Sequence, residues 1–331
     1  MPSLKAIRKR ITSVQSTQKI TRAMKMVAGA RLNRAQARIT ELRPFAVKTQ
    51  QILASISVDP ARATGDALAP AADAPKEGSE IVEIVADDKP AHPLLVQRPE
   101  RRVLLVVLTS DRGLCGAFNA NINKRAEREW RARKSQGQEV QMLVVGRKGR
   151  DYLTRRNAPV LAYLPGIWDK LGFETAKQVG AAALAPFLKK DIDAIYLVYN
   201  EFKSAMSQTV VAERLLPVDP AKATQAEAAQ AEAKGAQAGS EAPAGVELMF
   251  EPTREALLEQ LAPMYVDISV LRALYESQAS ELGARMTAMD AATKNAKEMI
   301  AALTLQYNKA RQAAITKELM EIIGGSEALK E

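Results

Sequence analysis

The sequence is poor in cysteine, histidine and aromatic side chains: its 331 residues include one cysteine, one histidine and 5% aromatics. Because Cys115 stands alone, the chain has no intrachain disulfide framework and no multi-cysteine metal site. The single histidine, His92, lies in a stretch rich in proline and alanine, which argues against histidine-rich zinc sites and against a Ser-His-Asp triad. Few aromatics together with abundant alanine and methionine favour helix packing over an all-β sandwich.

Long apolar runs are also missing. The longest strongly apolar stretch, Val103–Leu108, has six residues, whereas a membrane-spanning helix needs about 18 or more. The first residues carry no apolar signal region, and their helical pattern continues without the break of a cleavable transit peptide. We therefore expect a chain that is cytosolic, or that lies on a membrane only through a bound partner.

Acidic residues are absent from the first 38 positions, which hold ten lysines and arginines. Residues 251–331 carry a small negative excess, so the formal net charge of +9 comes from the first segment. A solvated helix face is the simplest interpretation. Binding to nucleic acid, to anionic lipid or to an acidic protein surface are the alternatives that this charge leaves open.

Both ends of the chain show the periodicity of long helices. From Leu4 to Ile56, seam positions recur at alternating spacings of three and four, which is the heptad pattern of a coiled coil. Gln18, Thr21 and Lys25 interrupt the apolar seam. Pro44 lies off the seam and should kink the helix or remove one backbone bond.

The second long helix is predicted from about Arg254 to Ile323. Pro263 should kink it, and Gly324-Gly325 should end it. Its apolar series is Leu257, Leu261, Met264, Ile268, Leu271, Tyr275, Leu282, Met286, Met289, Ala296, Ile300, Leu303, Tyr307, Ala310 and Ala314. The period of 3.5 predicts that the two terminal helices pair as a long antiparallel, left-handed coiled coil.

The middle of the chain alternates strand-like and helix-like segments. The predicted strands are 103–109, 140–145, 160–164, 194–199 and 209–216, and the predicted helices are 119–134, 147–157 and 175–188. This alternation predicts a Rossmann-like, doubly wound α/β domain, with a largely parallel sheet and helices on its faces. The expected fold class is therefore α/β, with the coiled coil attached.

Two stretches of biased composition contain too few large apolar residues to pack. One is rich in proline and alanine, and the other in alanine, glutamine and glutamate. With them, the chain divides into five segments: a long N-terminal helix (1–58), an insertion and linker (59–99), the α/β domain (100–217), a second insertion (218–245) and a terminal segment with the long C-terminal helix (246–331).

No catalytic site is legible. Ser110–Gly116 follows a strand and precedes a helix, where a phosphate loop can lie. It lacks both the G-x-G-x-x-G and the G-x-x-x-x-G-K-[ST] spacing, so a structured βα turn is the preferred interpretation. Cys115 has no basic partner that would activate it as a nucleophile. We expect no catalytic, metal-binding or cofactor-binding residues.

Three classes of function remain open: a structural or mechanical component of an assembly, a nucleic-acid-binding protein, and an α/β enzyme with a coiled-coil arm. Nucleic-acid binders usually add aromatic stacking groups or a groove-entering motif. Residues 1–38 contain no Phe, Tyr or Trp. The enzyme class lacks a site.

Four stretches, in order along the chain, resemble the signatures of the gamma-subunit family of F-type ATP synthases. They are Ile7–Ala28, which contains Arg-Ala-Met-Lys-Met-Val, Thr109–Asn119, which contains Ser-Asp-Arg-Gly-Leu-Cys-Gly, Glu281–Ala296, and Tyr307–Ile323. The resemblance covers the chain except for about 59–88 and 218–245.

The resemblance implies that the paired helices form a central rotor shaft inside a ring of three alpha and three beta subunits, with unequal contacts that shift the conformations of the catalytic beta subunits. The α/β domain and the foot of the shaft would bind the epsilon subunit and the membrane rotor c-ring, which ion flow turns. The shaft would carry no cofactor and no catalytic site. It would lie, as a peripheral protein, on the cytoplasmic face of the bacterial inner membrane.

Roles for particular shaft residues also follow from the resemblance. Met24 and Lys25 would lie near an acidic lever segment of the beta subunits. Polar contacts that couple the shaft angle to the ring would come from Arg285, Arg311, Gln312 and Thr316. Ordinary solvated coiled-coil charge is the competing interpretation for the two arginines.

At the foot, Phe250 and Glu251 match the segment that faces the rotor ring, while Leu319–Ile323, at the other end, would sit in a low-friction sleeve. In the chloroplast branch of the family a cysteine-bearing loop near 218–245 gives thiol control. This chain has no cysteine there, so thiol switching by that route is excluded. We expect segment 218–245 to act as a tether or a brake.

Overall fold

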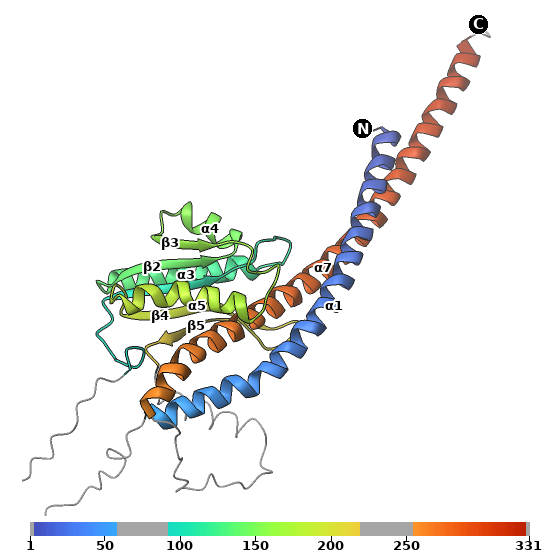
Figure 1. Cartoon of the computed structure of the whole chain (residues 1–331). Helices are drawn as coiled ribbons and strands as arrows, with labels where there is room; N and C mark the ends of the chain where they lie inside the picture. The colour runs from blue at the N-terminus through green and yellow to red at the C-terminus, as the bar shows by residue number, and fades with distance from the viewer. Residues whose placement is uncertain (1–2, 58–91, 219–253, 329–331) are drawn as a thin grey trace, which may run out of the picture.

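The computed structural model describes residues 3–57, 92–218 and 254–328. Within these ranges, an α/β body lies against one end of a long two-helix rod (Figure 1). Most of the two predicted insertions falls outside the described residues, so the division into five segments stays a prediction.

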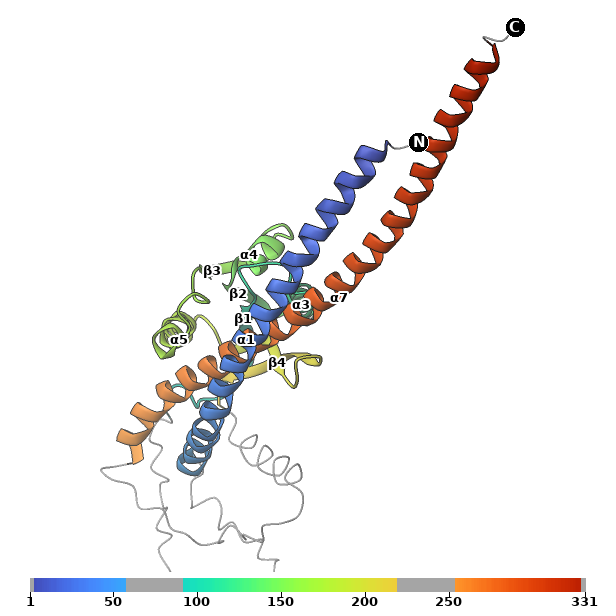
Figure 2. The same cartoon turned by 90° about the vertical axis from the view of Figure 1, so that its right-hand side faces the viewer.

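The rod consists of α1 (Leu4–Ser57) and α7 (Arg254–Ala328). The two helices run antiparallel along each other, and Figure 2 shows the pair from a second side. The predicted heptad positions of α1 whose burial is described are all buried or half-buried, namely Leu4, Ile7, Ile11, Val14, Gln18, Thr21, Lys25, Ala28, Leu32, Ala35, Ile39, Leu42, Ala46 and Thr49. The burial of the last two predicted positions, Leu53 and Ile56, lies outside the description. The predicted antiparallel coiled coil is thus confirmed.

The surroundings of α7 change along its length, and its burial changes with them. Between Ala262 and Met289 the helix is covered on most sides, because it lies between α1 and the sheet of the body. From Ala292 to Ala310 only one face is covered, by α1. From Arg311 to Ser326 every residue is exposed, because this part of α7 extends beyond the N-terminal end of α1.

Two residues predicted for the apolar series of α7 are exposed. Met264 is 44% exposed, because the buried row at this level is Ala262, Val266 and Val270, which packs with the core of the body. Ala314 is exposed because it lies beyond the last turn of α1.

The predicted end of α7 at Gly324-Gly325 is also wrong, since the helix continues to Ala328. Glycine weakens a helix by about 1 kcal/mol per residue but can adopt helical dihedral angles. Pro44 and Pro263 likewise lie inside continuous helices, where each removes one backbone hydrogen bond.

The body is built on one five-stranded sheet. Its strands are β1 (Arg102–Leu108), β2 (Glu139–Val145), β3 (Val160–Leu164), β4 (Ala194–Phe202) and β5 (Gln208–Leu216). The spatial order is β3-β2-β1-β4-β5; the first four strands are parallel, and β5 is antiparallel to β4. The doubly wound, largely parallel sheet is therefore confirmed, with one antiparallel edge.

Helices cover both faces of this sheet. On one face lie α3 (Phe118–Ser135) and α4 (Arg147–Thr154), and on the other lie α5 (Phe173–Leu188) and the middle of α7. In β1, Val103, Leu105 and Val107 pack on the first face, while Leu104, Val106 and Leu108 pack on the second. A central parallel strand is buried on both faces, which explains its uninterrupted apolar run.

Glycine lets the rod approach α5 closely. A Cβ atom on Gly180 of α5 would lie 2.5 Å from Oδ1 of Asp267 in α7. A larger residue at 180 would force the carboxylate of Asp267 to move. The middle of α7 is thus a structural part of the body as well as of the rod.

Replacing one seam residue tests the rod. Ile39→Ala should lower the free energy of unfolding by about 2–4 kcal/mol, because a buried isoleucine leaves a cavity. Ile39 is 4% exposed and belongs to a cluster with Phe202 and Leu282. Urea unfolding of the full chain measures the loss.

The matched control is Ile20→Ala, the same change on the same helix at a residue that is 57% exposed. Its cost should stay below about 1 kcal/mol. Equal losses of unfolding free energy in the two variants would contradict the burial of Ile39 in the seam between α1 and α7.

Candidate functional site

Polar pairs cross the rod where the apolar seam is interrupted. The hydroxyl oxygens of Thr21 and Thr293 lie 2.8 Å apart, and Nζ of Lys25 lies 2.5 Å from Oδ1 of Asp290. The hydrogen bond from Lys25, with that from Lys294, lowers the pKa of the Asp290 carboxyl. The sequence signalled these positions as breaks in the seam, and the structure shows that α7 carries complementary groups.

Met24 and Lys25, both predicted to contact another subunit, are half-buried beside α7. The ammonium group of Lys25 is engaged with Asp290, and 44% of its side chain is exposed. Ile20, Met26 and Val27 are exposed on the same stretch of α1, each by more than half. The middle of the rod therefore presents an apolar surface next to a partly neutralised lysine.

Arg8 makes a polar contact near the start of α1. Its guanidinium donates to the hydroxyl of Tyr307 over 2.6 Å and lies 5.5 Å from the centre of the same ring. Beyond this contact α7 continues as a single helix (Figure 1).

The single-helix projection, residues 311–326, carries three of the predicted coupling residues. Arg311, Gln312 and Thr316 are all exposed there. At 100° per residue, they share one side of the helix with its exposed apolar groups, which are Ile315, Leu319, Met320, Ile322 and Ile323. The opposite side carries an ion pair of 3.5 Å between Lys317 and Glu321. The projection is therefore amphipathic although no described element covers it.

Arg285 lies apart from these three residues, roughly 39 Å below Arg311 along the helix. Its guanidinium forms an ion pair with Glu281 and donates to the carbonyl of Gly113 over 3.2 Å. It thereby links α7 to the turn after β1. A contact between Arg285 and another subunit stays a prediction, as does that of Arg311.

Phe250 and Glu251, the predicted foot contacts, lie outside the described residues. The insertion 218–245 does so as well, apart from Val218.

The turn after β1 is held by its own hydrogen bonds. Oδ1 of Asn119 accepts from the backbone N–H of Ser110 over 3.0 Å, and the hydroxyl of Ser110 donates to the carbonyl of Arg112 over 2.6 Å. Cys115 is buried beneath it, and burial raises the pKa of its thiol. A low thiolate population disfavours nucleophilic chemistry at this cysteine.

A partly buried charged cluster joins the sheet to the rod, and the sequence did not predict it. The hydroxyl of Tyr199 donates to Glu213 over 2.7 Å, and Arg272 of α7 donates to both oxygens of the same carboxylate over 2.6 Å. One turn further along α7, Glu276 is 5% exposed. The i, i+4 pair of charges inside an otherwise apolar stretch was the available signal.

Burial raises the pKa of Glu276 to about 7, against the pull of Arg272 and, from α1, Arg43. Glu201 of β4 and Glu213 of β5 raise it further. One of its carboxylate oxygens, Oε2, is buried and has no hydrogen-bond partner among the described residues. This carboxyl is therefore protonated over part of the neutral pH range.

The described ranges contain no group of three or more side chains arranged to hold a metal ion. Nor does any described helix have an apolar stretch long enough to cross a bilayer. The candidate functional surface is therefore the rod itself: the exposed stretch around Met24 and the single-helix projection.

Comparison with known proteins gives one consistent result. A family model described as ATP synthase matches residues 3–329. The chain is 68% identical over 332 residues to the ATP synthase gamma chain of Sorangium cellulosum (strain So ce56), and 43% identical over 330 residues to that of Geobacter sp. (strain M21). Each match covers all of both chains.

Among solved structures, one chain of the Euglena gracilis mitochondrial ATP synthase (OSCP/F1/c-ring, rotational state 3) aligns with a TM-score of 0.60 at 21% identity. The alignment covers 98% of this chain and 94% of that one. It shows that the fold is shared.

The buried carboxyl of Glu276 generates a prediction about pH. Because its pKa is near 7 in the folded chain and near 4.5 when unfolded, the folded state holds an extra proton between these values. The resulting stability is present below about pH 4.5 and is lost as the pH rises through 7, by up to about 3 kcal/mol.

Glu276→Gln should flatten this dependence, as measured by urea unfolding between about pH 5 and pH 8. Glu298→Gln, at an exposed residue of the same helix, serves as the control and should leave it intact. An unchanged profile in Glu276→Gln would rule out this carboxyl as the source.

Proposed function

The chain belongs to the gamma-chain family of F-type ATP synthase and is its non-catalytic central shaft, and we propose that the rod transmits rotation to catalytic beta subunits through two surfaces. One is the single-helix projection, residues 311–326. The other is the exposed stretch of α1 around Met24. The catalytic sites of this enzyme lie on beta subunits, which accounts for a shaft without an active site.

Unequal sides are what allow a shaft to drive its surroundings. The projection has an apolar side and a charged side, and lower down α1 lies on one side of α7 only. Such a rod meets each subunit of a surrounding ring with a different surface at any angle. Different contacts favour different conformations of the subunits, and rotation exchanges them.

The observation that carries this proposal is the continuation of α7 past α1. The 16 residues from Arg311 to Ser326 form about 24 Å of helix that no other described element covers. A lone helix of this length is marginal in water, and its apolar side calls for surrounding protein.

The partners follow from the family. Three alpha and three beta subunits would surround the upper rod, while the epsilon subunit and the membrane c-ring would bind the body and the foot, including Phe250 and Glu251. The chain itself would lie on the cytoplasmic face of the inner membrane, held there by these subunits. The ten basic residues of positions 1–38 suit an acidic segment of the beta subunits.

The nucleic-acid alternative has no support from these relatives. The segment 218–245 remains a candidate tether or brake. Deleting it should change the rate of ATP hydrolysis or its coupling to ion movement, and unchanged values would count against this role.

Purification tests the assembly. The tagged chain, isolated from membranes of its own cells, should retain large nucleotide-binding subunits in a stable complex. Recovery of salt-sensitive nucleic acid in their place would contradict the shaft assignment.

Replacing Arg311 tests the projection. In the assembled enzyme, Arg311→Ala should lower ATP-driven ion pumping by roughly three- to tenfold, the size expected for the loss of one hydrogen bond of average net strength. The unfolding free energy of the isolated chain should stay the same, because Arg311 is exposed.

Lys317→Ala is the matched control, since this residue lies on the opposite side of the same exposed helix. It should pump at close to the normal rate. Equal effects from both substitutions would refute a specific coupling role for Arg311.

A further inference from the structure

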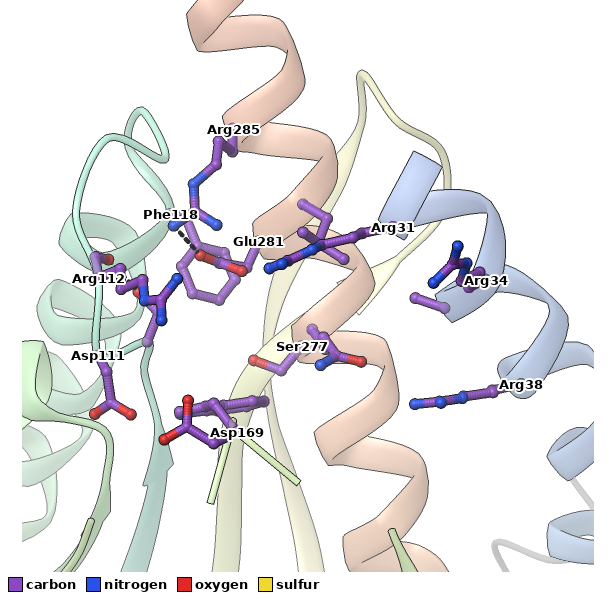
Figure 3. A pocket seen from close by; sticks show the side chains of 15 residues that line it. Arg31, Arg34, Arg38, Asp111, Arg112, Phe118, Asp169, Ser277, Glu281 and Arg285 are labelled. Atoms are coloured by element: carbon purple, nitrogen blue, oxygen red, sulfur yellow. Dashed lines mark hydrogen bonds and ion pairs between the residues drawn. The ribbon is translucent and has the colours of Figure 1, made fainter. Parts of the chain in front are cut away.

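A cavity of about 460 Å³ lies where the rod meets the body. Five parts of the chain line it: α1, the turn after β1, the start of α3 at Phe118, the segment 168–169 before α5, and the middle of α7 (Figure 3). A volume of this size is typical of small-molecule sites. Neither of the two proposed coupling surfaces includes it.

Arginine dominates the charged lining. The arginines are Arg31, Arg34 and Arg38 of α1, Arg112 of the turn and Arg285 of α7. The lining carboxylates are Asp111, Asp169 and Glu281. The cavity therefore has an excess of positive charge. Three of its arginines belong to the acid-free first segment, and the other two come from the turn and from α7.

Three of these arginines are available for a ligand. In the described ranges, the guanidinium groups of Arg31, Arg34 and Arg112 make no hydrogen bond and no ion pair. Figure 3 shows Arg31 and Arg112 approaching the hollow from opposite sides, one from the rod and one from the body.

Two of the three carboxylates are already engaged. Glu281 forms an ion pair with Arg285, and Oδ1 of Asp111 accepts the backbone N–H of Arg147 over 2.8 Å. Burial raises the pKa of the Glu281 carboxyl, while the charges of Arg285, Arg112 and Arg31 oppose that rise. Arg31 and Arg112 therefore already face this carboxylate, although neither forms an ion pair with it.

Two more observations point to a bound oxyanion. The indole N–H of Trp168, a lining residue, is buried and has no acceptor among the described residues. The cavity is also lined by the turn that follows the carboxyl end of β1, the strand next to which the order of the sheet reverses. Open α/β sheets bind their ligands at this point.

We propose that this cavity binds a small phosphorylated anion, held by Arg31, Arg34 and Arg112. The planar, forked guanidinium group suits phosphate oxygens, because it can donate two parallel hydrogen bonds to them. Inorganic pyrophosphate and a nucleoside diphosphate share this chemistry, and both are small enough for the cavity. An acidic peptide fits less well, because a cavity of about 460 Å³ has the size of a small-molecule site and not of an extended peptide groove.

Such a ligand would fasten the rod to the body. Arg31 and Arg34 belong to α1, whereas Arg112 belongs to the turn that Arg285 ties to α7. An anion between them would add charge-assisted bonds across the junction, and it would resist movement of α1 relative to the body.

Calorimetric titration of the full chain with inorganic pyrophosphate, and separately with ADP, tests the site. Each probe that fits should bind with a stoichiometry of one, and the two arms distinguish an inorganic from a nucleotide ligand. Arg31→Gln and Arg112→Gln should each weaken binding about tenfold or more. Thermal unfolding of the variants verifies that these exposed substitutions leave the fold intact.

Arg10→Gln is the matched control, because it removes the same charge from the same helix roughly 32 Å away. It should bind as tightly as the parent chain. If no probe binds at millimolar concentration, or if all three variants lose affinity equally, the site does not exist.

The assembled enzyme provides the second test. Phenylglyoxal should modify Arg31 and Arg112 in the complex, as read by mass spectrometry, and pyrophosphate should protect both residues but not Arg10. If Arg31 and Arg112 are unreactive in the complex before any probe is added, another subunit fills the cavity, and the proposal is overturned.

Discussion

The packing of α1 along α7 is the contact on which the rest of the structure depends. Ala28, Leu32, Ala35 and Ile39 are buried against α7, and this seam holds together two segments from opposite ends of the chain. Without this packing, the apolar seam of each helix would be exposed to solvent beyond the body. Small side chains at 28 and 35 let the helices approach closely, so the rod stays slender.

A second constraint is that the middle of α7 has two neighbours. Its apolar rows serve both α1 and the sheet, which leaves little room for solvent-facing residues between Ala262 and Met289. Both arginines of this span are joined to the body: Arg272 to Glu213, and Arg285 to Gly113. Unpaired charges would be costly in this position, so the same groups that satisfy burial also fix the rod to the sheet.

Much of this architecture could be predicted from the sequence, because an element that buries one face shows a regular spacing of apolar residues. The seam of α1 and the strands of the body follow simple periods of 3.5 and 2. The pattern of α7 was harder, since a helix with two buried sides shows no single stripe; Met264 was misplaced for that reason. Ala314 was misjudged because the sequence does not show where the partner helix stops. The glycine pair was misjudged because glycine weakens a helix without necessarily ending it. The clusters around Glu276 and Arg31 depend on residues from several elements, which only the fold brings together.

The unequal lengths of the two helices have a mechanical consequence. Torque applied to the tip of α7 travels down one helix as far as the contact between Arg8 and Tyr307, and down two helices after that. A single helix twists more easily than a packed pair. Elastic deformation should therefore concentrate in the last turns of the chain, which act as a soft coupling in series with a stiff axle.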